Sequence, residues 1–266
     1  MLVNIYYIFI SYGVLVKTSD CLNYLETLLK SKSIKDYAPN GLQISGKSEI
    51  KTLITGVTAN EALIDAAINE KADAILVHHG FFFKGEEAVI TGMKRNRIAK
   101  LLAQDINLIA YHLPLDFHPV FGNNVALAAI LDIEVEGTFS SGPWQQAGCF
   151  GSFKKDLTPE ELEKCIHQKL LRRPLHIGGS QKRIRTVAWA TGAAQDYIVE
   201  ASRLGVDAYI TGEASERTCH YARELNIHFF SAGHHATERY GVKNLGSHLA
   251  DKFKIKHKFI DIENPI

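Results

Sequence analysis

Two adjacent histidines, His78 and His79, have the residue type and placing that first suggest chemistry. They close the apolar run 72–77, which is typical of a buried β-strand, and Gly80 follows them. The glycine lets the backbone turn, so both imidazoles could face one site at the carboxyl end of the strand. A hydrogen-bonded histidine pair at the rim of a sheet is the alternative interpretation.

Two histidine–carboxylate pairs favour the first interpretation. His112 precedes Asp116 by four residues, and His234 precedes Glu238 by the same spacing. Each pair comes just after an apolar segment, so each is expected near the end of a strand, where α/β sheets bind ligands. Taken singly, His234 could cap a helix and Glu238 could be a solvated side chain. The repeated placing makes a shared site the better explanation.

Imidazoles and carboxylates without thiolates suit an open site for Zn, Fe, Mn, Ni or Co rather than a closed structural zinc site. Two neighbouring metal ions lower the pKa of a bridging water and stabilise charge on an attacked carbonyl or phosphoryl group, which is hydrolase chemistry. Five protein ligands leave room for water at two such ions. The predicted metal ligands are His78, His79, Asp116, His234 and Glu238. His112 could ligate, orient Asp116 or carry a proton, and we assign it the catalytic role.

Alternating strands and helices should position these residues. A strand at 51–57, a helix at 60–70 and the strand that delivers His78 form a βαβ unit, which predicts parallel strands and a right-handed crossover. A helix at 91–104 and a strand at 105–111 then deliver His112.

The second half of the chain resembles the first. Residues 186–213 follow 52–79 at a constant offset, with Val-Asp-Ala-Tyr-Ile matching Ala-Asp-Ala-Ile-Leu. We therefore expect an α/β fold of two similar domains, produced by internal duplication, with a dinuclear metal site in the cleft between them. The expected domains are 1–135, with an N-terminal extension at 1–17, and 136–266. Residues 133–146 are expected to be irregular, and 254–262 to form a last strand.

Composition limits the classes of function. With 46% hydrophobic and 22% charged residues, the chain is typical of a globular protein of one or two domains. Its 30 basic and 29 acidic residues produce no overall field for nucleic acid or an anionic membrane, so neither is an expected partner. Four dispersed cysteines without a C-x-x-C motif indicate a reducing compartment, and we expect the cytoplasm.

The first 16 residues are apolar, but they lack a cationic start and are too short to span a bilayer. An added strand, an oligomer contact or a start codon placed too early are the interpretations we favour over export.

Several longer motifs resemble the Nif-three-like family, whose members are labelled GTP cyclohydrolase 1 type 2 homologues, and within it the bacterial YbgI branch. The resemblance covers nearly the whole chain after about Asp20 and rests on segments 37–43, 77–80, 93–97, 112–116, 122–124, 233–238 and 261–265. It implies two α/β domains, two divalent metal ions per subunit (Zn, Fe, Mn or Ni) and a homohexameric ring with the sites facing its interior. Carried over position by position, the family's metal ligands fall on the same five residues. Segment 148–151 lacks the arginine that relatives often carry there.

Three hypotheses for function follow. The first is a metal-dependent hydrolase acting on a small, nucleotide-like or cyclic substrate, with Lys94, Arg95 or Arg97 as anion contacts. The second is a non-catalytic protein that stores, delivers or senses metal. The third is a ring-shaped scaffold that contacts DNA or protein through residues 172–173 and 182–185, which the near-zero net charge argues against.

Overall fold

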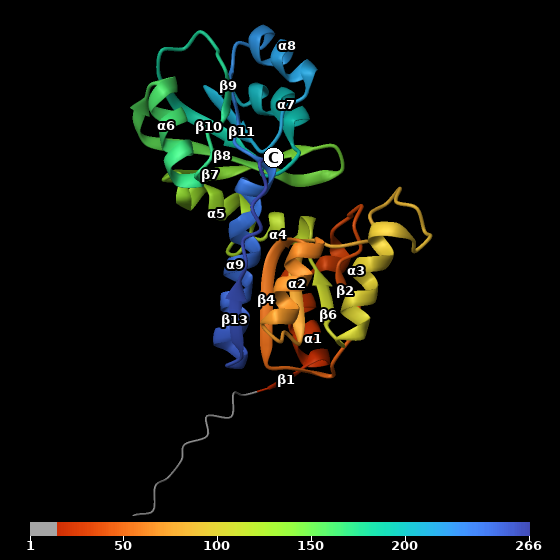
Figure 1. Ribbon diagram of the computed structural model, residues 1–266. Coiled ribbons are helices and arrows are strands. Elements are labelled where there is room, and N and C mark those ends of the chain that lie inside the picture. The colour runs from red at the N-terminus through yellow and green to blue at the C-terminus, as the bar shows by residue number, and fades with distance from the viewer. Residues whose placement is uncertain (1–14) are drawn as a thin grey trace, which may run out of the picture.

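Two mixed β-sheets and a two-stranded ribbon make up the β-structure of the computed structural model (Figure 1). The structure describes residues 15–266. Segment 1–14 of the expected N-terminal extension lies outside the described residues. The end of that extension is β1 (Val16–Lys17), which pairs antiparallel with β3 (Glu49–Ile50) to form the ribbon. The expected α/β class is thus confirmed, and both sheets are mixed.

The first sheet carries the histidine pair. Its strands lie in the order β13 (Lys256–Phe259), β4 (Thr52–Thr58), β5 (Ala74–His79), β6 (Asn107–Ala110) and β2 (Gly41–Ile44). The central strands β4, β5 and β6 are parallel, and α2 (Glu61–Asn69) and α3 (Gly92–Ala103) connect them, as the βαβ prediction requires. β5 includes both histidines at its carboxyl end, so it is longer than the apolar run alone.

Helices cover both faces of this sheet, which explains why its strands are almost continuously apolar. On one face, Leu53 and Leu76 pack with α1 (Thr18–Leu29) and with the helix at 234–253. On the other face, Ile54 and Ile75 pack with α2 and α3. A short 3₁₀ turn, η1 (Ser31–Ser33), follows α1 and leads into the loop before β2.

The second sheet has the order β7 (Ile133–Ser141), β8 (Trp144–Leu157), β10 (Ile184–Trp189), β11 (Ala208–Thr211), β12 (His228–Ser231) and β9 (Leu175–Ile177). Strands β10, β11 and β12 are parallel, and β9 is antiparallel to β12. The segments between its strands include the helices α6 (Pro159–Leu170), η2 (Gln195–Tyr197), α7 (Ile198–Arg203) and α8 (Glu216–Glu224).

The prediction of irregular structure at 133–146 is wrong, because this segment belongs to the antiparallel hairpin of β7 and β8. The hairpin turns at Gly142, whose φ of 55° lies in the left-handed region that favours glycine. β7 is an edge strand with several exposed polar residues. Its composition therefore resembles that of a loop, although its backbone is extended.

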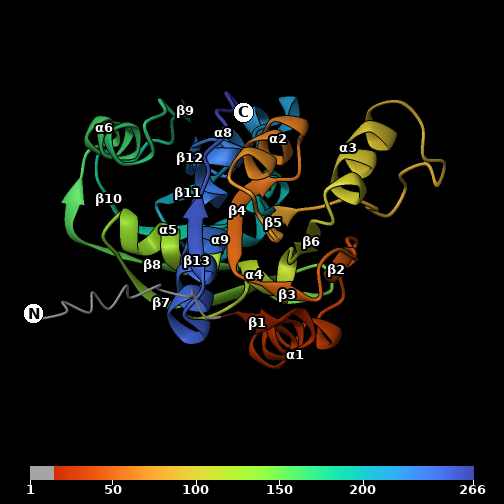
Figure 2. The same ribbon diagram turned by 60° about the horizontal axis from the view of Figure 1, so that its bottom comes forward.

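The longest helix joins the two sheets. α9 (His234–Phe253) begins near the second sheet and runs along the first, where Val242 and Leu245 join its core (Figures 1 and 2). β13 then pairs in parallel with β4. The expected strand near the end of the chain is confirmed, but it lies in the first sheet. The expected boundary at 135/136 would have placed it in the second domain. Two helices, α4 (Leu113–Asp116) and α5 (Asn123–Ile130), connect β6 to β7.

No helix within residues 15–266 is both long and apolar enough to cross a bilayer. The expected cytoplasmic location stays a prediction.

Candidate metal centre

His78 and His79 enter the site from the carboxyl end of β5. His78 is fully buried and His79 is partly exposed. Nδ1 of His78 lies 3.0 Å from the backbone oxygen of Tyr111, and Nδ1 of His79 lies 3.1 Å from the Thr58 hydroxyl at the end of β4. These contacts hold both rings with Nε2 free for another partner.

His112 and Asp116 reach the same site from the start and the end of α4, directly after β6. Nδ1 of His112 lies 2.9 Å from Oδ1 of Asp36. Asp116 is buried, and its Oδ1 accepts a hydrogen bond of 2.8 Å from the Asn123 amide and one of 3.3 Å from the Thr191 hydroxyl. Thr191 follows β10, so the second sheet helps to orient a carboxylate from the first half of the chain.

His234 and Glu238 lie one turn apart at the beginning of α9. Nδ1 of His234 lies 2.6 Å from Oε1 of Glu213, which follows β11, and its Nε2 lies 3.0 Å from Oε2 of Glu238. Glu238 is almost fully buried.

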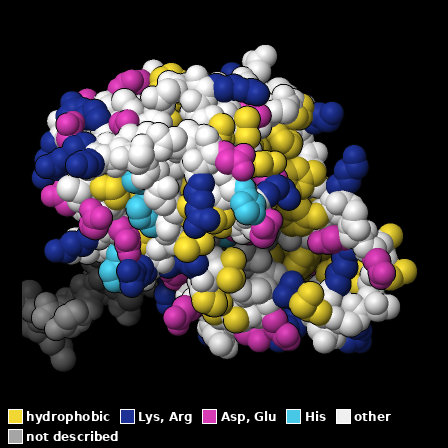
Figure 3. All heavy atoms as spheres, turned by 90° about the horizontal axis from the view of Figure 1, so that it is seen from above, with side chains coloured by type: hydrophobic (Ala, Val, Ile, Leu, Met, Phe, Trp, Pro, Cys, Tyr) yellow, Lys and Arg dark blue, Asp and Glu magenta, His cyan; other side chains and the backbone are white. Residues whose placement is uncertain are grey.

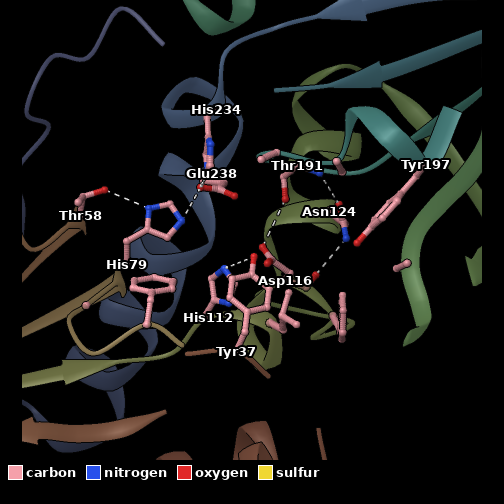
Figure 4. Close-up of a pocket in the computed structure, with 17 residues that line it drawn as sticks. Tyr37, Thr58, His79, His112, Asp116, Asn124, Thr191, Tyr197, His234 and Glu238 are labelled. Atoms are coloured by element: carbon pink, nitrogen blue, oxygen red, sulfur yellow. Dashed lines mark hydrogen bonds and ion pairs between the residues drawn. The ribbon is translucent and has the colours of Figure 1, made fainter. Parts of the chain in front are cut away.

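All four imidazoles therefore have Nδ1 engaged, which leaves Nε2 for the cluster. Figure 4 shows three of them, His79, His112 and His234, around the cavity. Nε2 of His78 lies 3.5 Å from a carboxylate oxygen of Asp116 and 3.5 Å from one of Glu238. Nε2 of His79 lies 3.3 Å from Glu238. Three overlapping groups of donor atoms, each within 4.8 Å, result: His78, His79 and His112; His79, His234 and Glu238; and His78, Asp116 and Glu238.

The donor set fits a metal. Nε2 of His78 and Oε2 of Glu238 are buried, and within the described part of the chain neither makes a contact with hydrogen-bond geometry, although Nε2 of His234 and Nε2 of His79 lie 3.0 and 3.3 Å from Oε2. Such atoms are costly unless a cation or water meets them. Gly192 keeps the space beside them open: a Cβ there would lie 2.1 Å from Oε1 of Glu238 and 3.2 Å from Nε2 of His234. These buried His/Asp/Glu clusters are compatible with a metal site.

An open cavity of about 360 Å³ gives access to this cluster. Its walls include the aromatic rings of Tyr37, Phe83, Phe117 and Tyr197. Within the run Phe81–Phe83, Phe81 packs in the core and Phe83 lines the cavity. The cavity is within the size range of small-molecule sites.

Comparisons with known proteins agree with this architecture. A sequence profile described as Duf34/NIF3 (NGG1p interacting factor 3) matches residues 16–265. The chain belongs to the Duf34/NIF3 family. A relative named GTP cyclohydrolase 1 type 2 homolog, from Vibrio cholerae, is 55% identical over 244 residues, covering 91% of this chain and 96% of that one. The protein of the same name from Escherichia coli is 48% identical over 252 residues, covering 94% and 100%.

Solved structures of relatives share the fold. A structure described as protein ybgI, of unknown function, has a TM-score of 0.91 at 47% identity and covers 94% of this chain and 100% of that chain. A protein of Thermus thermophilus has a TM-score of 0.85 at 28% identity, again covering 94% and 100%. The predicted family resemblance is confirmed.

Opposite charges shift pKa values within the site of this NIF3-family protein. Burial lowers the pKa of His78, but the carboxylates of Asp116 and Glu238 outweigh it and raise the value to about 9. At His234, burial also lowers the pKa, but the Glu238 carboxylate outweighs it and raises the value to about 9. Burial dominates at His79 and lowers its pKa well below the usual value. Burial raises the pKa of Asp116. At Glu238 the neighbouring imidazoles outweigh burial and hold the pKa well below its usual value.

The structure brings all six predicted site residues of this NIF3-family protein together. It does not bring the predicted anion contacts there. Lys94 pairs with Glu86 at 3.2 Å and lines a separate hollow with Arg97, and Arg95 lines neither cavity.

Sequence reasoning missed the residues that hold the donors in place. Asp36, Thr58 and Glu213 each fix one imidazole, while Asn123 and Thr191 fix Asp116. Asn123 lies in the Gly-Asn-Asn segment that the family resemblance includes, so this motif could have indicated it.

Proposed function

We propose that this protein is a metal-dependent hydrolase with a dinuclear site. His78, His79, Asp116, His234 and Glu238 would hold two divalent ions, of Zn, Fe, Mn or Ni. The observation that carries the proposal is a buried pair of atoms without a hydrogen bond of regular geometry, Nε2 of His78 and Oε2 of Glu238, in a cluster whose Glu238 lines an open cavity.

The overlap of the three donor groups supports two ions rather than one. His78, His79 and Glu238 each belong to two of the groups, so neighbouring ions could share the cluster. When bound, such ions supply an acidified water and polarise an attacked carbonyl or phosphoryl oxygen. The neighbouring cavity leaves one side of the cluster accessible to a substrate.

His112 would carry the proton. Its Nδ1 is held by Asp36, which leaves Nε2 facing the cavity, 3.4 Å from the Tyr37 hydroxyl. A histidine held this way can take a proton from the attacking water and return it to the leaving group. Asp36 would stabilise the imidazolium that forms in between.

We also propose, from the family resemblance, that six copies form a ring. Val89, Ile90 and Met93 are each more than half exposed and lie together around the start of α3. Such residues would be shielded at a contact between copies. Light scattering of the purified protein measures the mass: six chains would support the ring, and a monomer would overturn it.

The test of the hydrolase is metal content per chain, measured on protein purified without a metal-affinity tag, followed by a hydrolysis screen. The wild type should contain about two ions per chain, and Asp116→Ala should lose both metal and activity. Asp251→Ala, an exposed carboxylate on α9, is the matched control and should keep both. Metal without turnover would favour storage, delivery or sensing. No metal in the wild type would overturn the site.

A further inference from the structure

Among the described residues, histidines are the only side chains in the wall of the cavity beside the His/Asp/Glu cluster that can carry a positive charge. Seventeen described residues line it, and none of them is lysine or arginine. On the face seen in Figure 3, the Lys and Arg side chains are interspersed with Asp and Glu and form no continuous cationic track. The cavity therefore lacks the usual partners of a polyphosphate chain.

Bound metal ions would not make the site strongly positive. Four carboxylates surround the cluster: Asp116 and Glu238 among the donors, and Asp36 and Glu213 behind His112 and His234. Together they carry four negative charges when ionised, which two divalent ions would balance. The loaded centre would thus be close to neutral, and a triphosphate would find little net attraction.

The walls instead suit a flat, uncharged ring. Tyr37 comes from the loop before β2 and Tyr197 from η2 of the second sheet, and they lie on different sides of the cavity (Figure 4). The Tyr37 ring lies 4.8 Å from the ring of His112 and 6.1 Å from that of Phe83. Burial raises the pKa of both tyrosines, so their hydroxyls remain uncharged hydrogen-bonding groups. Aromatic walls of this kind stack on planar heterocycles.

We propose that this cavity binds an uncharged, planar cyclic amide, such as a cyclic imide or a nucleobase, and not a nucleoside triphosphate. The substrate class rests on the proposed hydrolase function. The oxygen of water would bond to the ring carbonyl carbon, and the carbon–nitrogen bond would break. One proton of the water would pass through His112 to the leaving nitrogen, so the ring opens to a carboxylic acid and an N–H group, which belongs to an amide when the ring is an imide and to a urea when it is a pyrimidine base; no other reactant is needed.

The test is equilibrium binding, which does not require turnover. Isothermal titration would compare hydantoin, uracil, guanosine and GTP, with the metal-loaded protein and after metal removal. Guanosine and GTP share the base and ribose, so their comparison isolates the phosphate chain. We expect guanosine to bind at least as tightly as GTP in both forms. Tighter binding of GTP, or no binding of any uncharged probe, would overturn the proposal.

Variants locate the binding. Tyr37→Ala and Tyr197→Ala should each weaken binding of the uncharged rings about tenfold, because a stacking surface is lost. Tyr37→Phe should keep it, which separates stacking from misfolding. Tyr221→Ala, on exposed α8, is the control and should bind as the wild type does. Equal binding in all four variants would overturn the assignment. Binding without ring opening would support the ligand class and count against the hydrolase.

Discussion

Nδ1 of His112 lies 2.9 Å from Oδ1 of Asp36, which stands 76 positions earlier in the chain. The same carboxylate accepts hydrogen bonds from the backbone N–H of Leu113 and from the side chain of Asn40, so it is itself held firmly. A carboxylate in this position keeps the proton on Nδ1 and leaves the lone pair of Nε2 directed at the His/Asp/Glu cluster. Asp36 is thus a positioning residue for the proposed proton carrier.

Replacing Asp36 with Asn should lower turnover by roughly 100-fold and leave the metal content unchanged. The amide can still meet the backbone, but it no longer stabilises a charged imidazole. Nitrogen NMR of the His112 ring provides a second measurement, because in a fraction of the molecules the proton should move from Nδ1 to Nε2. Unchanged turnover together with an unchanged tautomer would contradict this role.

Gly192→Ala should weaken metal binding by at least tenfold. The added Cβ would lie 2.1 Å from Oε1 of Glu238, and the displaced carboxylate is a proposed ligand. Gly205→Ala is the matched control: the two glycines have φ angles of 70° and 71°, but a Cβ at Gly205 meets nothing within 4 Å. Both variants carry the same backbone strain, so competitive titration with a chelator should separate them. Equal metal affinities would contradict the steric explanation.

Glu213→Gln should lower metal affinity by roughly 10-fold to 100-fold. Glu213 lies 2.6 Å from Nδ1 of His234 and therefore orients this ring and increases its basicity. Glu216→Gln is the comparison, because the Glu216 carboxylate pairs with the exposed His220 and its loss should have no effect on the metal. The same chelator titration measures both variants, and a wild-type affinity for Glu213→Gln would refute the prediction.

The ionised carboxylate of Asp73 should stabilise the fold at neutral pH, and this stabilisation should be lost at strongly acidic pH. It accepts hydrogen bonds of 2.9 Å from the backbone N–H of Lys51 and of Thr52, and Lys47 lies 2.7 Å away. Burial raises its pKa, but these partners outweigh it and hold the pKa below the usual value. A lowered folded-state pKa stabilises the protein above the unfolded value, near 4, and this stabilisation is lost as the pH falls through the folded value.

The matching experiment is urea unfolding of the wild type and Asp73→Asn at pH 7 and pH 3. The variant should lose about 1–2 kcal/mol of unfolding free energy at pH 7 and less at pH 3. The same loss at both values would show that the charge is not responsible.

Asp207 repeats this arrangement in the second sheet. Its Oδ2 accepts hydrogen bonds of 2.9 Å from the backbone N–H of Arg185 and of Thr186. Asp73 and Asp207 stand at equivalent places in the two Asp-Ala segments that the sequence comparison matched. Internal duplication of the two domains stays a prediction, and this shared feature supports it.

The convergence of the six residues could be predicted because each lies at the end of a strand or several residues beyond one, and the apolar pattern of these strands is visible in the sequence. The residues that hold their rings could not, since Asp36, Thr58 and Glu213 are single polar residues in loops or at strand ends. Only the folded chain shows which histidine each of them meets. The hairpin at 133–157 escaped prediction because an exposed edge strand has the composition of a loop. The alternation of residue types identified β13 as a strand, but this pattern does not show which sheet the strand joins.

The path of α9 has a consequence for biosynthesis. Two proposed ligands, His234 and Glu238, come well after the other three in the chain, and the helix that carries them is held by the first sheet. β13, which follows, pairs with a strand some 200 positions earlier. A nascent chain that ends before α9 presents the histidines of β5 with Asp116 but without Glu238. The complete set of proposed ligands therefore exists only after α9 has been synthesised and has packed on the first sheet.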